Sequence, residues 1–420
     1  MADRAHPMDV GFDIESVPRV REKADDQRVR PHMVSSVARP SLLTYSSLPY
    51  NGHGPAQSCV SILEHIPPTT LSVALMMPRC TKRLQPSIKF KQALPEPLRR
   101  LPWRYVRGLG RRAVANCFAD AIDAADPRDT IAYFWPDHST ALVKRAKARG
   151  IVTVREMINC DRGTAKTILD AVYRDADLPP GHGISEESVA EEREQLALYD
   201  YVFASNQVEP GLIEAGVDPS RILPTSFGWD PQRFPGVRDA VPSARFTALF
   251  VGTVSIRKGV LQLLAAWKRS GVDGVLKIVG SVLPEISPKL EPYLNDTSIE
   301  FVGFQSQVSD LYHSSDLFIF PSFEEGGPQV VYEAAGCGLP VIATPMGGGR
   351  MVRDGVNGLI VQPNDIDGLA AAIRDMAASP EKRGAYGRQG AVDARKYTYE
   401  EIGKDRAAML LRIMEKNNRR

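Results

Sequence analysis

Short, strongly apolar runs alternate along this chain with glycine-containing turns and with longer stretches of mixed polarity. The runs at 317–320 (LFIF) and 341–343 (VIA) are typical of strands that are buried on both faces of a sheet. Comparable runs stand at 41–46, 130–134 and 246–251. Turns and segments with helical spacing follow them, so the pattern predicts an α/β protein built from strand–turn–helix units.

The segment 320–344, which reads FPSFEEGGPQVVYEAAGCGLPVIAT, joins two of these strands through a turn and a helix. Pro328 suits the first position of that helix, because its missing N–H would have no partner there. A helix N-terminus presents free amide groups and a partial positive charge, so the amides near Gln329 and Val330 could hold a phosphate. The sequence therefore predicts an anion site at this turn.

Two carboxylates flank the predicted anion site. Glu325 precedes the helix and Glu333 lies within it, and carboxylates are poor phosphate ligands but good acceptors for hydroxyl groups. The ribose and the hexose of a nucleotide sugar carry such hydroxyls at either end of a diphosphate. Gly326 and Gly327 would let a ligand approach the backbone of the turn closely. The alternative interpretation is an ordinary strand–turn–helix unit with a solvated glutamate.

A pair of cations, Arg257 and Lys258, stands in the stretch 252–259 (GTVSIRKG), at the predicted start of another helix. Cations at this end oppose the helix dipole, but they suit a bound pyrophosphate, with charge-assisted contacts worth about 1.5–3 kcal/mol each. The alternative is a solvated basic pair.

The glutamate pair with seven residues between its members, the Gly-Gly-Pro after Glu325 and the trailing Cys-Gly-Leu-Pro-Val-Ile-Ala-Thr resemble the retaining family 4 glycosyltransferases. These belong to the glycosyl transferases group 1 superfamily, with the glycogen-synthase-like enzymes. The resemblance implies the GT-B fold, an α/β fold with two Rossmann-like, doubly wound domains that face a central cleft. It also implies that Glu325 binds the donor sugar, Glu333 the donor ribose and the Arg257–Lys258 pair the diphosphate, with no metal and no cofactor. The implied donor-binding residues are Gly252, Arg257, Lys258, Gly303, Val308, Glu325, Gly326, Gly327, Gln329, Val330 and Glu333, of which Arg257, Lys258 and Glu325 are the catalytic candidates.

A glycine turn, NGHGP at 51–55, follows the first predicted strand. As a dinucleotide fingerprint it fails, because Gln57 stands where the third glycine is needed. In the resembling family the equivalent turn faces the donor phosphates and the acceptor, which makes Gly52, His53 and Gly54 candidate contacts. The alternative is a tight strand-to-helix turn without a ligand.

Polar side chains also follow later strands of the first half. Asp137 and the stretch 156–159 (EMIN) fall at predicted strand ends, where ligands gather in open α/β sheets. Many relatives carry a histidine about where Glu156 stands, so the role of that histidine is not transferred. Two alternatives stay open: Glu156 and Asn159 take its place, or they face an acceptor.

Charge is distributed unevenly within the first half. The stretch 79–112 carries 11 cations and a single acid, Glu96, interleaved with apolar residues such as Trp103 and Leu109. This composition suits an anionic membrane surface, near which each cation contributes about 1 kcal/mol, or an anionic acceptor. A solvated helix face is the alternative. Nucleic acid is not predicted as a partner, because the stretch matches no recognised binding module.

The length of 420 residues predicts two domains. We place a disordered or loosely packed N-terminal arm at 1–39, an acceptor-side Rossmann-like domain at 40–239 and a donor-binding domain at 240–394. The resemblance implies that a final helix, at 395–420, crosses back to complete the first domain. Five scattered cysteines, a polar N-terminus and the lack of a membrane-length apolar run favour a cytoplasmic protein, with peripheral attachment to the inner face of the membrane as an option.

The predicted function is transfer of a sugar from a nucleotide-diphosphate sugar to a hydroxyl of a glycan or lipid-linked acceptor, with retention at the anomeric carbon. The resemblance implies a place in polysaccharide, lipopolysaccharide or glycolipid synthesis. The main alternative is a non-catalytic GT-B scaffold or binding subunit, which the departure at Glu156 allows. A nucleotide-sugar epimerase or a phosphorylase on the same fold also stays open. The incomplete glycine fingerprint argues against a nicotinamide oxidoreductase.

Overall fold

The computed structural model describes residues 39–52, 54–237 and 245–419. These residues fall within one compact unit, Arg39–Arg420. The predicted N-terminal arm, apart from Arg39, and the candidate residue His53 lie outside the described residues.

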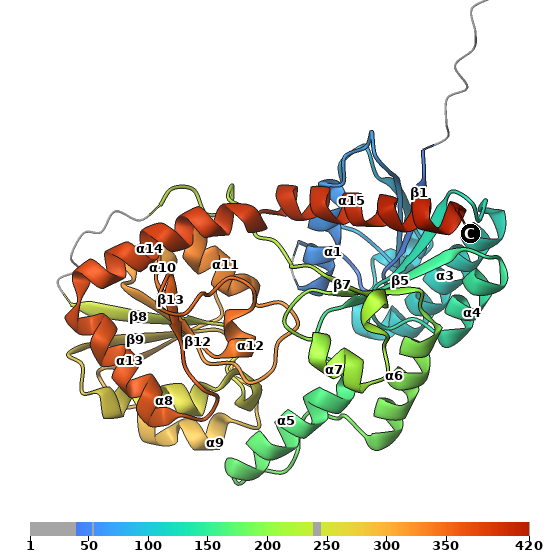
Figure 1. The fold of residues 1–420 in the computed structure, drawn as a ribbon. Coiled ribbons are helices and arrows are strands. Elements are labelled where there is room, and N and C mark those ends of the chain that lie inside the picture. Colours follow the sequence, from blue (N-terminus) through green and yellow to red (C-terminus); the bar gives the residue numbers. More distant parts are fainter. Residues whose placement is uncertain (1–38, 53, 238–244, 420) are drawn as a thin grey trace, which may run out of the picture. The chain divides into compact units, whose positions relative to one another are not determined.

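The first half of the described chain forms a parallel sheet with the strand order β3-β2-β1-β4-β5-β6-β7 (Figure 1). Its strands are β1 (Ser41–Tyr45), β2 (Ser72–Met77), β3 (Lys89–Gln92), β4 (Thr130–Phe134), β5 (Val152–Met157), β6 (Tyr201–Ala204) and β7 (Ile222–Pro224). Its helices are α1 (Pro55–Glu64), α2 (Glu96–Arg99), α3 (Trp103–Ala124), α4 (Thr140–Ala148), α5 (Arg162–Asp175), α6 (Glu186–Leu198) and α7 (Glu209–Glu214). The strand order reverses between β1 and β4, and such a switch point opens a crevice at the carboxyl ends of the strands.

The second half repeats this plan in a parallel sheet with the order β10-β9-β8-β11-β12-β13. Its strands are β8 (Phe246–Val251), β9 (Gly274–Val279), β10 (Ile299–Gly303), β11 (Leu317–Phe320), β12 (Val341–Ala343) and β13 (Gly358–Ile360). Its helices, and those that follow, are α8 (Val260–Ser270), α9 (Ser287–Leu290), α10 (Ser309–Ser314), α11 (Gln329–Gly336), α12 (Pro345–Gly348), α13 (Ile366–Ala378), α14 (Pro380–Ala394) and α15 (Tyr399–Asn418). Here the order reverses between β8 and β11, so the segment after β11 begins at a second switch point.

Strand β4 shows why these strands lack an alternation of apolar and polar residues. All five of its residues are buried. Ile131 and Tyr133 pack into a core shared with α1 and α15, whereas Ala132 and Phe134 pack into a core shared with α3 and α4. Because both faces of the strand are covered, both sets of side chains must be apolar, as the continuous run in the sequence predicted.

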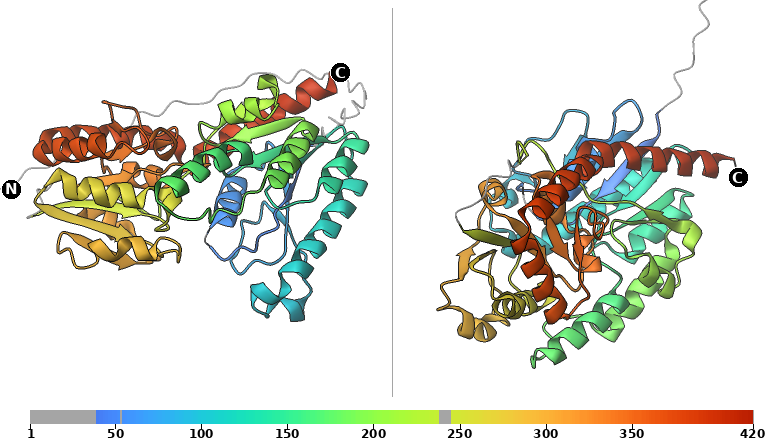
Figure 2. Two further views of the ribbon diagram at one scale, coloured as in Figure 1. Left: turned by 90° about the horizontal axis from the view of Figure 1, so that it is seen from below. Right: turned by 60° about the vertical axis from the view of Figure 1, so that its left-hand side comes forward.

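Helix α3 packs on the first sheet through residues spaced four apart. Val106, Val114, Phe118 and Ile122 are buried on its inner face. Burying each of these side chains stabilises the fold by about 1.5–3 kcal/mol. The N-terminal turns of α3 and the short α2 extend beyond the helices around them (Figure 2).

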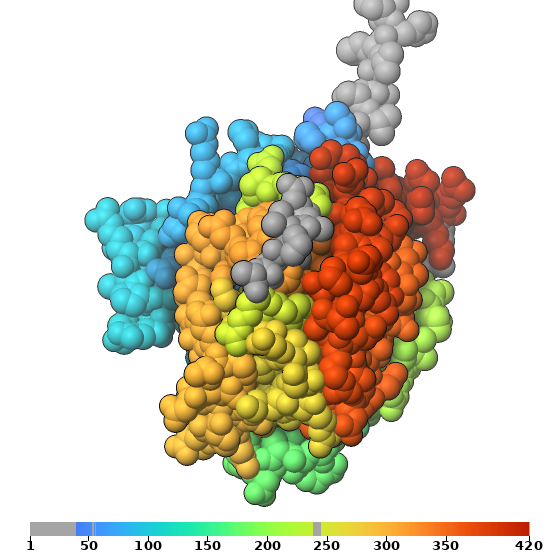
Figure 3. Space-filling model, turned by 90° about the vertical axis from the view of Figure 1, so that its left-hand side faces the viewer, coloured from blue at the N-terminus to red at the C-terminus, as the bar shows by residue number. Residues whose placement is uncertain are grey.

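The last two helices run beside both halves of the described chain. Helix α14 contacts α11, and α15 contacts α1. In the space-filling view the C-terminal helices, in red, lie directly beside the yellow and orange segments of the second half (Figure 3). Tyr399, Ile402 and Leu410 of α15 belong to the same core as the first sheet. The chain therefore returns to the first half after completing the second.

Within the part of the chain that the structure describes, no helix combines the length and apolar character required to cross a membrane.

Candidate functional site

A cavity of about 580 Å³ is lined by loops from both sheets. From the second half it is lined by five residues of the predicted donor site: Arg257, Val308, Gly327, Gln329 and Val330. From the first half it is lined by three of the predicted cleft residues: Gly52, Gly54 and Asn159. Residues that lie far apart in the sequence thus meet around one space of the size of a ligand site.

A second cavity, of about 690 Å³, adjoins the first. Its lining includes Asp137 and Asn159 from the first half and Arg257 and Glu324 from the second. Asn159 and Arg257 line both cavities. Arg257 therefore stands at the junction between the two spaces.

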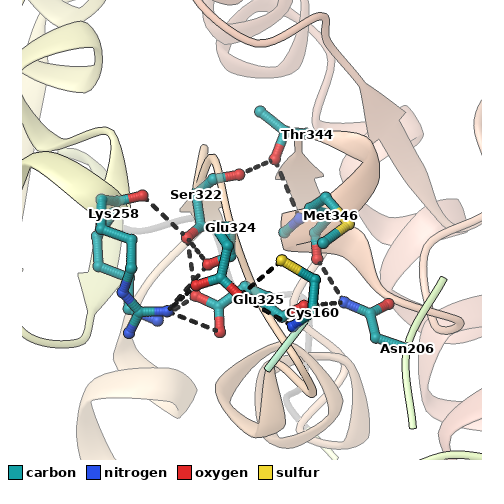
Figure 4. Close-up of polar contacts among 10 residues, drawn as sticks. Cys160, Asn206, Lys258, Ser322, Glu324, Glu325, Thr344 and Met346 are labelled. Carbon is teal, nitrogen blue, oxygen red and sulfur yellow. Dashed lines mark hydrogen bonds and ion pairs between the residues drawn. The ribbon is translucent and has the colours of Figure 1, made fainter. Parts of the chain in front are cut away.

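Four charged side chains meet beside this junction (Figure 4). Arg257 Nη1 lies 3.0 Å from Glu324 Oε2 and 4.0 Å from Glu325 Oε2. Lys258 forms an ion pair with Glu325, and the Ser322 hydroxyl donates to the same carboxylate over 2.7 Å. Two cations and two carboxylates thus balance one another in charge.

Burial and charge act in opposite directions on the Glu325 carboxyl group. Burial alone would raise its pKa, but the attraction of Lys258 and Arg257, together with the hydrogen bond from Ser322, brings the pKa below its ordinary value. Glu325 is therefore ionised, and it holds Lys258 in place. Its side chain is only 8% exposed.

The local backbone conformation sets the position of Arg257 and Lys258. Residues Ile256–Lys258 form a single 3-10 turn directly after the loop that follows β8. Helix α8 begins only at Val260, so the two cations lie in the turn before the helix rather than in its first turn. This turn reaches the 320–344 segment, because the Phe323 amide donates to the Arg257 carbonyl over 3.0 Å.

The start of α11 differs in detail from the prediction. Pro328 is the N-cap residue rather than the first helical residue. The Gln329 amide, predicted to face a phosphate, donates to the Gly327 carbonyl over 2.9 Å. The Gln329 side chain bonds across to the first half, donating to Ser58 and accepting from the Tyr399 hydroxyl. Gln329 and Val330 nevertheless line the 580 Å³ cavity.

Gly326 and Gly327 were predicted to give a ligand access to the backbone, and their immediate neighbours are protein atoms. A Cβ on Gly326 would stand 1.9 Å from the Ile158 carbonyl oxygen, and one on Gly327 would stand 1.9 Å from the Phe227 ring. Any side chain at these positions would therefore push the turn away from the first half. The need for glycine here arises at least partly from packing between the two halves.

Glu333 lies in α11, away from the charge cluster. It accepts a hydrogen bond from the Tyr312 hydroxyl over 3.1 Å, and burial raises its pKa. Of the described residues in the predicted donor set, Gly252, Lys258, Gly303, Glu325, Gly326 and Glu333 line neither cavity.

Glu156, a candidate cleft residue, is among the residues that line the 690 Å³ cavity, but its carboxylate is taken up by partners within the protein. Its side chain is fully buried and forms an ion pair with Arg406 of α15. Tyr133 and Ser205 donate to the same carboxylate. These partners satisfy the buried charge of Glu156, and its exchange with the family histidine stays a prediction.

Asp137 and Asn159, the other two predicted residues at strand ends, also line the 690 Å³ cavity. Asp137 adopts a positive φ of 65° and pairs with Arg111 at 2.7 Å. Asn159 is exposed at the boundary of both cavities.

Sequence reasoning missed two further residues of the site. Glu324 stands beside Glu325 in the sequence, so the doubled acid was the available signal for its place in the charge cluster. Asn206 follows β6 and donates to the Glu325 carbonyl over 3.1 Å. No local motif marks Asn206, because the contact joins residues from different halves.

No group of three or more histidine, cysteine or acidic side chains that could hold a metal ion occurs among residues 39–52, 54–237 and 245–419.

Solved structures share this arrangement of two parallel sheets. Sucrose-phosphate synthase from Thermosynechococcus elongatus superposes with a TM-score of 0.69 at 20% identity, covering 90% of this chain and 99% of that one. Anabaena HepE in complex with UDP-glucose superposes with a TM-score of 0.60 at 16% identity, covering 89% of this chain and all of that one. The predicted fold class is confirmed: this is a GT-B protein with two Rossmann-like sheets.

The second half carries a more specific relationship. Residues 245–379 match the family model of glycosyl transferases group 1. The resemblance stated from the sequence is thus supported for this part of the chain, and the finer assignment to the retaining family 4 stays a prediction.

Among curated proteins, a D-inositol 3-phosphate glycosyltransferase of Rhodococcus erythropolis is 30% identical over 249 residues, which is 54% of this chain and 55% of that protein. An uncharacterised glycosyltransferase of Methanocaldococcus jannaschii is 32% identical over 158 residues, which is 36% of this chain and 44% of that protein. The chain thus spans about half the length of the curated relatives it matches.

Proposed function

We propose that this protein is a glycosyltransferase that moves a sugar from a nucleotide-diphosphate sugar to a hydroxyl acceptor with retention of configuration. The match of 245–379 to glycosyl transferases group 1 supports the class of enzyme. The curated relatives are named as glycosyltransferases, and one structural neighbour was solved with UDP-glucose. These findings do not favour the non-catalytic alternative.

The observation that best supports the proposal is the position of Arg257. Arg257, from the family-matched segment, stands where two cavities meet, and one of these cavities is also lined by the start of α11. A guanidinium and helix-start residues around one space suit the two phosphates of a nucleoside diphosphate. The donor then occupies the 580 Å³ cavity, with the loop at Val308 beside its base.

In this proposal Arg257 and Lys258 stabilise the diphosphate as negative charge develops on it during departure. Their orientation is set beforehand by Glu324 and Glu325, so little reorganisation is needed at the moment of reaction. The leaving phosphate helps to deprotonate the acceptor on the same face of the sugar. As the resemblance implies, we assign sugar hydroxyls to Glu325 and the ribose to Glu333, although neither residue lines either cavity. Neither a metal nor a cofactor takes part in the proposed reaction.

The acceptor in this proposal enters the 690 Å³ cavity, where Asp137 and Asn159 present polar groups. Such a surface suits the hydroxyls of a glycan headgroup, free or carried on a lipid. We place the reaction in polysaccharide, lipopolysaccharide or glycolipid synthesis. The exposed cations and apolar side chains of 79–112 then serve to hold the enzyme at an anionic membrane surface.

The test of the donor site is a binding titration with UDP, GDP, ADP and dTDP, each alone and as its common sugar. A ligand that binds only the folded protein stabilises it by about 2.7 kcal/mol at a hundredfold excess over Kd. We expect one nucleotide series to raise the melting temperature, and Arg257→Ala to abolish that shift. Arg388→Ala, on the exposed face of α14, is the matched control and should leave the shift unchanged. If no nucleotide binds the wild-type protein, the proposed function is wrong.

A further inference from the structure

Glu324 connects the junction residue Arg257 to the first half of the chain. Figure 4 shows Glu324 beside Cys160 of the first half. Its Oε2 accepts from Arg257 Nη1 over 3.0 Å, and its main-chain carbonyl accepts from the same nitrogen over 3.0 Å. Its Oε1 accepts from the Cys160 amide over 3.1 Å and from the Cys160 thiol over 3.2 Å. One carboxylate thus bonds to a cation of the second half and to a backbone amide of the first.

The burial of Glu324 makes these contacts strong constraints. Its side chain is 3% exposed, whereas that of Arg257 is 33% exposed. A buried carboxylate is costly unless its partners remain in place, so Glu324 holds both of them. An arginine carries five N–H donors. Glu324 fixes one nitrogen of Arg257, and the residue still lines both cavities.

The turn that carries Glu324 is held from a second direction. Asn206 Nδ2 donates to the Glu325 carbonyl over 3.1 Å and to the Met346 carbonyl over 3.0 Å. Gly326 lies directly against the backbone of Ile158. The turn is therefore fixed to two loops of the first half, and the orientation of Arg257 depends on both halves being together.

We propose that Glu324 is a positioning residue for the transfer reaction: it aligns the Arg257 guanidinium for the departing diphosphate and couples that alignment to the 158–160 loop of the first half. This inference rests on the proposed function. Glu325, in contrast, holds Lys258 and receives Asn206 only at its main-chain carbonyl. The two neighbouring carboxylates thus act on different cations, and Glu324 is the one whose carboxylate bonds across the halves.

The first measurement separates binding from turnover in Glu324→Gln. The variant removes a negative charge 3.0 Å from Arg257 Nη1 but keeps an oxygen that accepts from Cys160. We expect the Kd of the responding nucleoside diphosphate to stay within about threefold of wild type. Arg257 keeps its positive charge in this variant, and the Glu324 carboxylate no longer competes with the diphosphate for it. We expect release of the nucleoside diphosphate from its sugar to slow by at least about tenfold, because Arg257 is no longer aligned. An unchanged turnover contradicts the proposal.

A double-mutant cycle with Arg257→Ala shows whether Glu324 acts through this arginine. In the Arg257→Ala background, Glu324→Gln should change turnover by less than about twofold. If it costs the same factor in both backgrounds, Glu324 does not act through Arg257. Glu300→Gln, on the exposed edge strand β10, is the chemically matched control and should retain wild-type turnover.

Hydrogen exchange tests the coupling without any ligand. In Glu324→Ala the Cys160 amide loses its acceptor and should exchange at least about tenfold faster, whereas Glu324→Gln should retain the protection. Equal protection in the wild type and the alanine variant overturns the coupling. Wild-type protein that binds none of the four nucleotides refutes the proposed function instead, so the two failures are distinguishable.

Discussion

At the scale of single residues, the charges of the site form two pairs, each made of one cation and one carboxylate. The motif predicted that Arg257, Lys258 and Glu325 share a site, and the structure brings them together. The resemblance assigned the two cations to the donor diphosphate and Glu325 to the donor sugar. In the structure each cation is instead paired with a carboxylate of the same turn, and Glu324 is one of the two. Spacing in a sequence shows which residues are near one another, but not which partner each one takes.

His138 shows how one buried side chain makes the stability of the molecule depend on pH. The ring is 9% exposed, its Nδ1 bonds to the Trp135 carbonyl over 2.8 Å and its Nε2 to the Tyr199 hydroxyl. Burial, and then the nearby positive charge of Arg155, lower its pKa from 6.5 to about 3. The histidine is therefore neutral in the folded protein throughout the physiological range.

The sign of the resulting pH dependence follows from proton counting. Between about pH 6.5 and pH 3 the unfolded chain binds a proton at His138 and the folded chain does not. The free energy of unfolding should therefore fall on acidification through this window, by about 1.4 kcal/mol per pH unit from this residue alone. Urea unfolding at pH 7.5 and pH 5 should show a smaller loss in His138→Gln than in the wild type. An equal loss in both would show that His138 does not contribute.

At the scale of secondary-structure elements, the strands were the most predictable part of the fold. The apolar runs at 130–134, 246–251, 317–320 and 341–343 coincide with β4, β8, β11 and β12. These strands could be predicted because both of their faces are buried, so that each strand is an unbroken run of apolar residues in the sequence. The first residues of helices were predicted less accurately. Pro328 is the N-cap of α11 rather than its first residue, and Arg257 and Lys258 lie in the turn before α8 rather than in the helix.

The N-terminal part of α3 carries an exposed apolar stripe among cations. Tyr105 is 68% exposed and Leu109 52%, and their spacing of four places them on one side of α3. Leu101, 43% exposed, lies two residues before the helix begins. Arg104 and Arg112 are also exposed in this helix. An apolar stripe flanked by cations suits the interface of an anionic bilayer.

We therefore expect the protein to sediment with vesicles containing anionic lipid and not with neutral vesicles. Replacing Leu101, Tyr105 and Leu109 together by serine should reduce binding to anionic vesicles by at least about tenfold, since each side chain loses roughly 1–2 kcal/mol of apolar burial. The unfolding midpoint should be unchanged, because these side chains face solvent. Exposed Val392, replaced by serine, is the control. Equal vesicle binding by the triple variant would exclude this surface as the attachment site.

At the scale of the whole molecule, the contacts that join the two halves could not be read from the sequence. The Glu156–Arg406 pair spans 250 positions, and Cys160 and Glu324 are 164 positions apart. Neither pair belongs to a local motif, so the sequence could not show that the Glu156 carboxylate is paired with a residue of α15. Glu156 and Asn159 had looked equivalent in the sequence, and only the second is exposed. The fold class followed from local patterns, whereas the allocation of polar side chains to core or cleft required the tertiary structure.

The buried Glu156–Arg406 pair also offers a test of what keeps α15 packed on the first half of the chain. Arg406 donates to Glu156, Tyr133 and Ser205, and its side chain is 1% exposed. Removing one member of such a pair leaves an uncompensated charge, so Arg406→Ala should lower the free energy of unfolding by about 3–5 kcal/mol. Lys404→Ala, which removes exposed pairs on the same helix, should cost no more than about 1 kcal/mol.

A double replacement separates the contribution of the charges from that of the helix contact. Arg406→Met combined with Glu156→Leu removes both charges and keeps apolar volume, and it should recover most of the stability lost in Arg406→Ala, because no buried charge is left unpaired. Urea unfolding measures this recovery, and hydrogen exchange in α15 shows whether the helix stays docked. If Arg406→Ala were no more destabilising than Lys404→Ala, the pair would not be what holds α15. If Glu156→Gln instead weakened nucleotide binding without changing stability, Glu156 would act in the cleft, as its position in the sequence suggested.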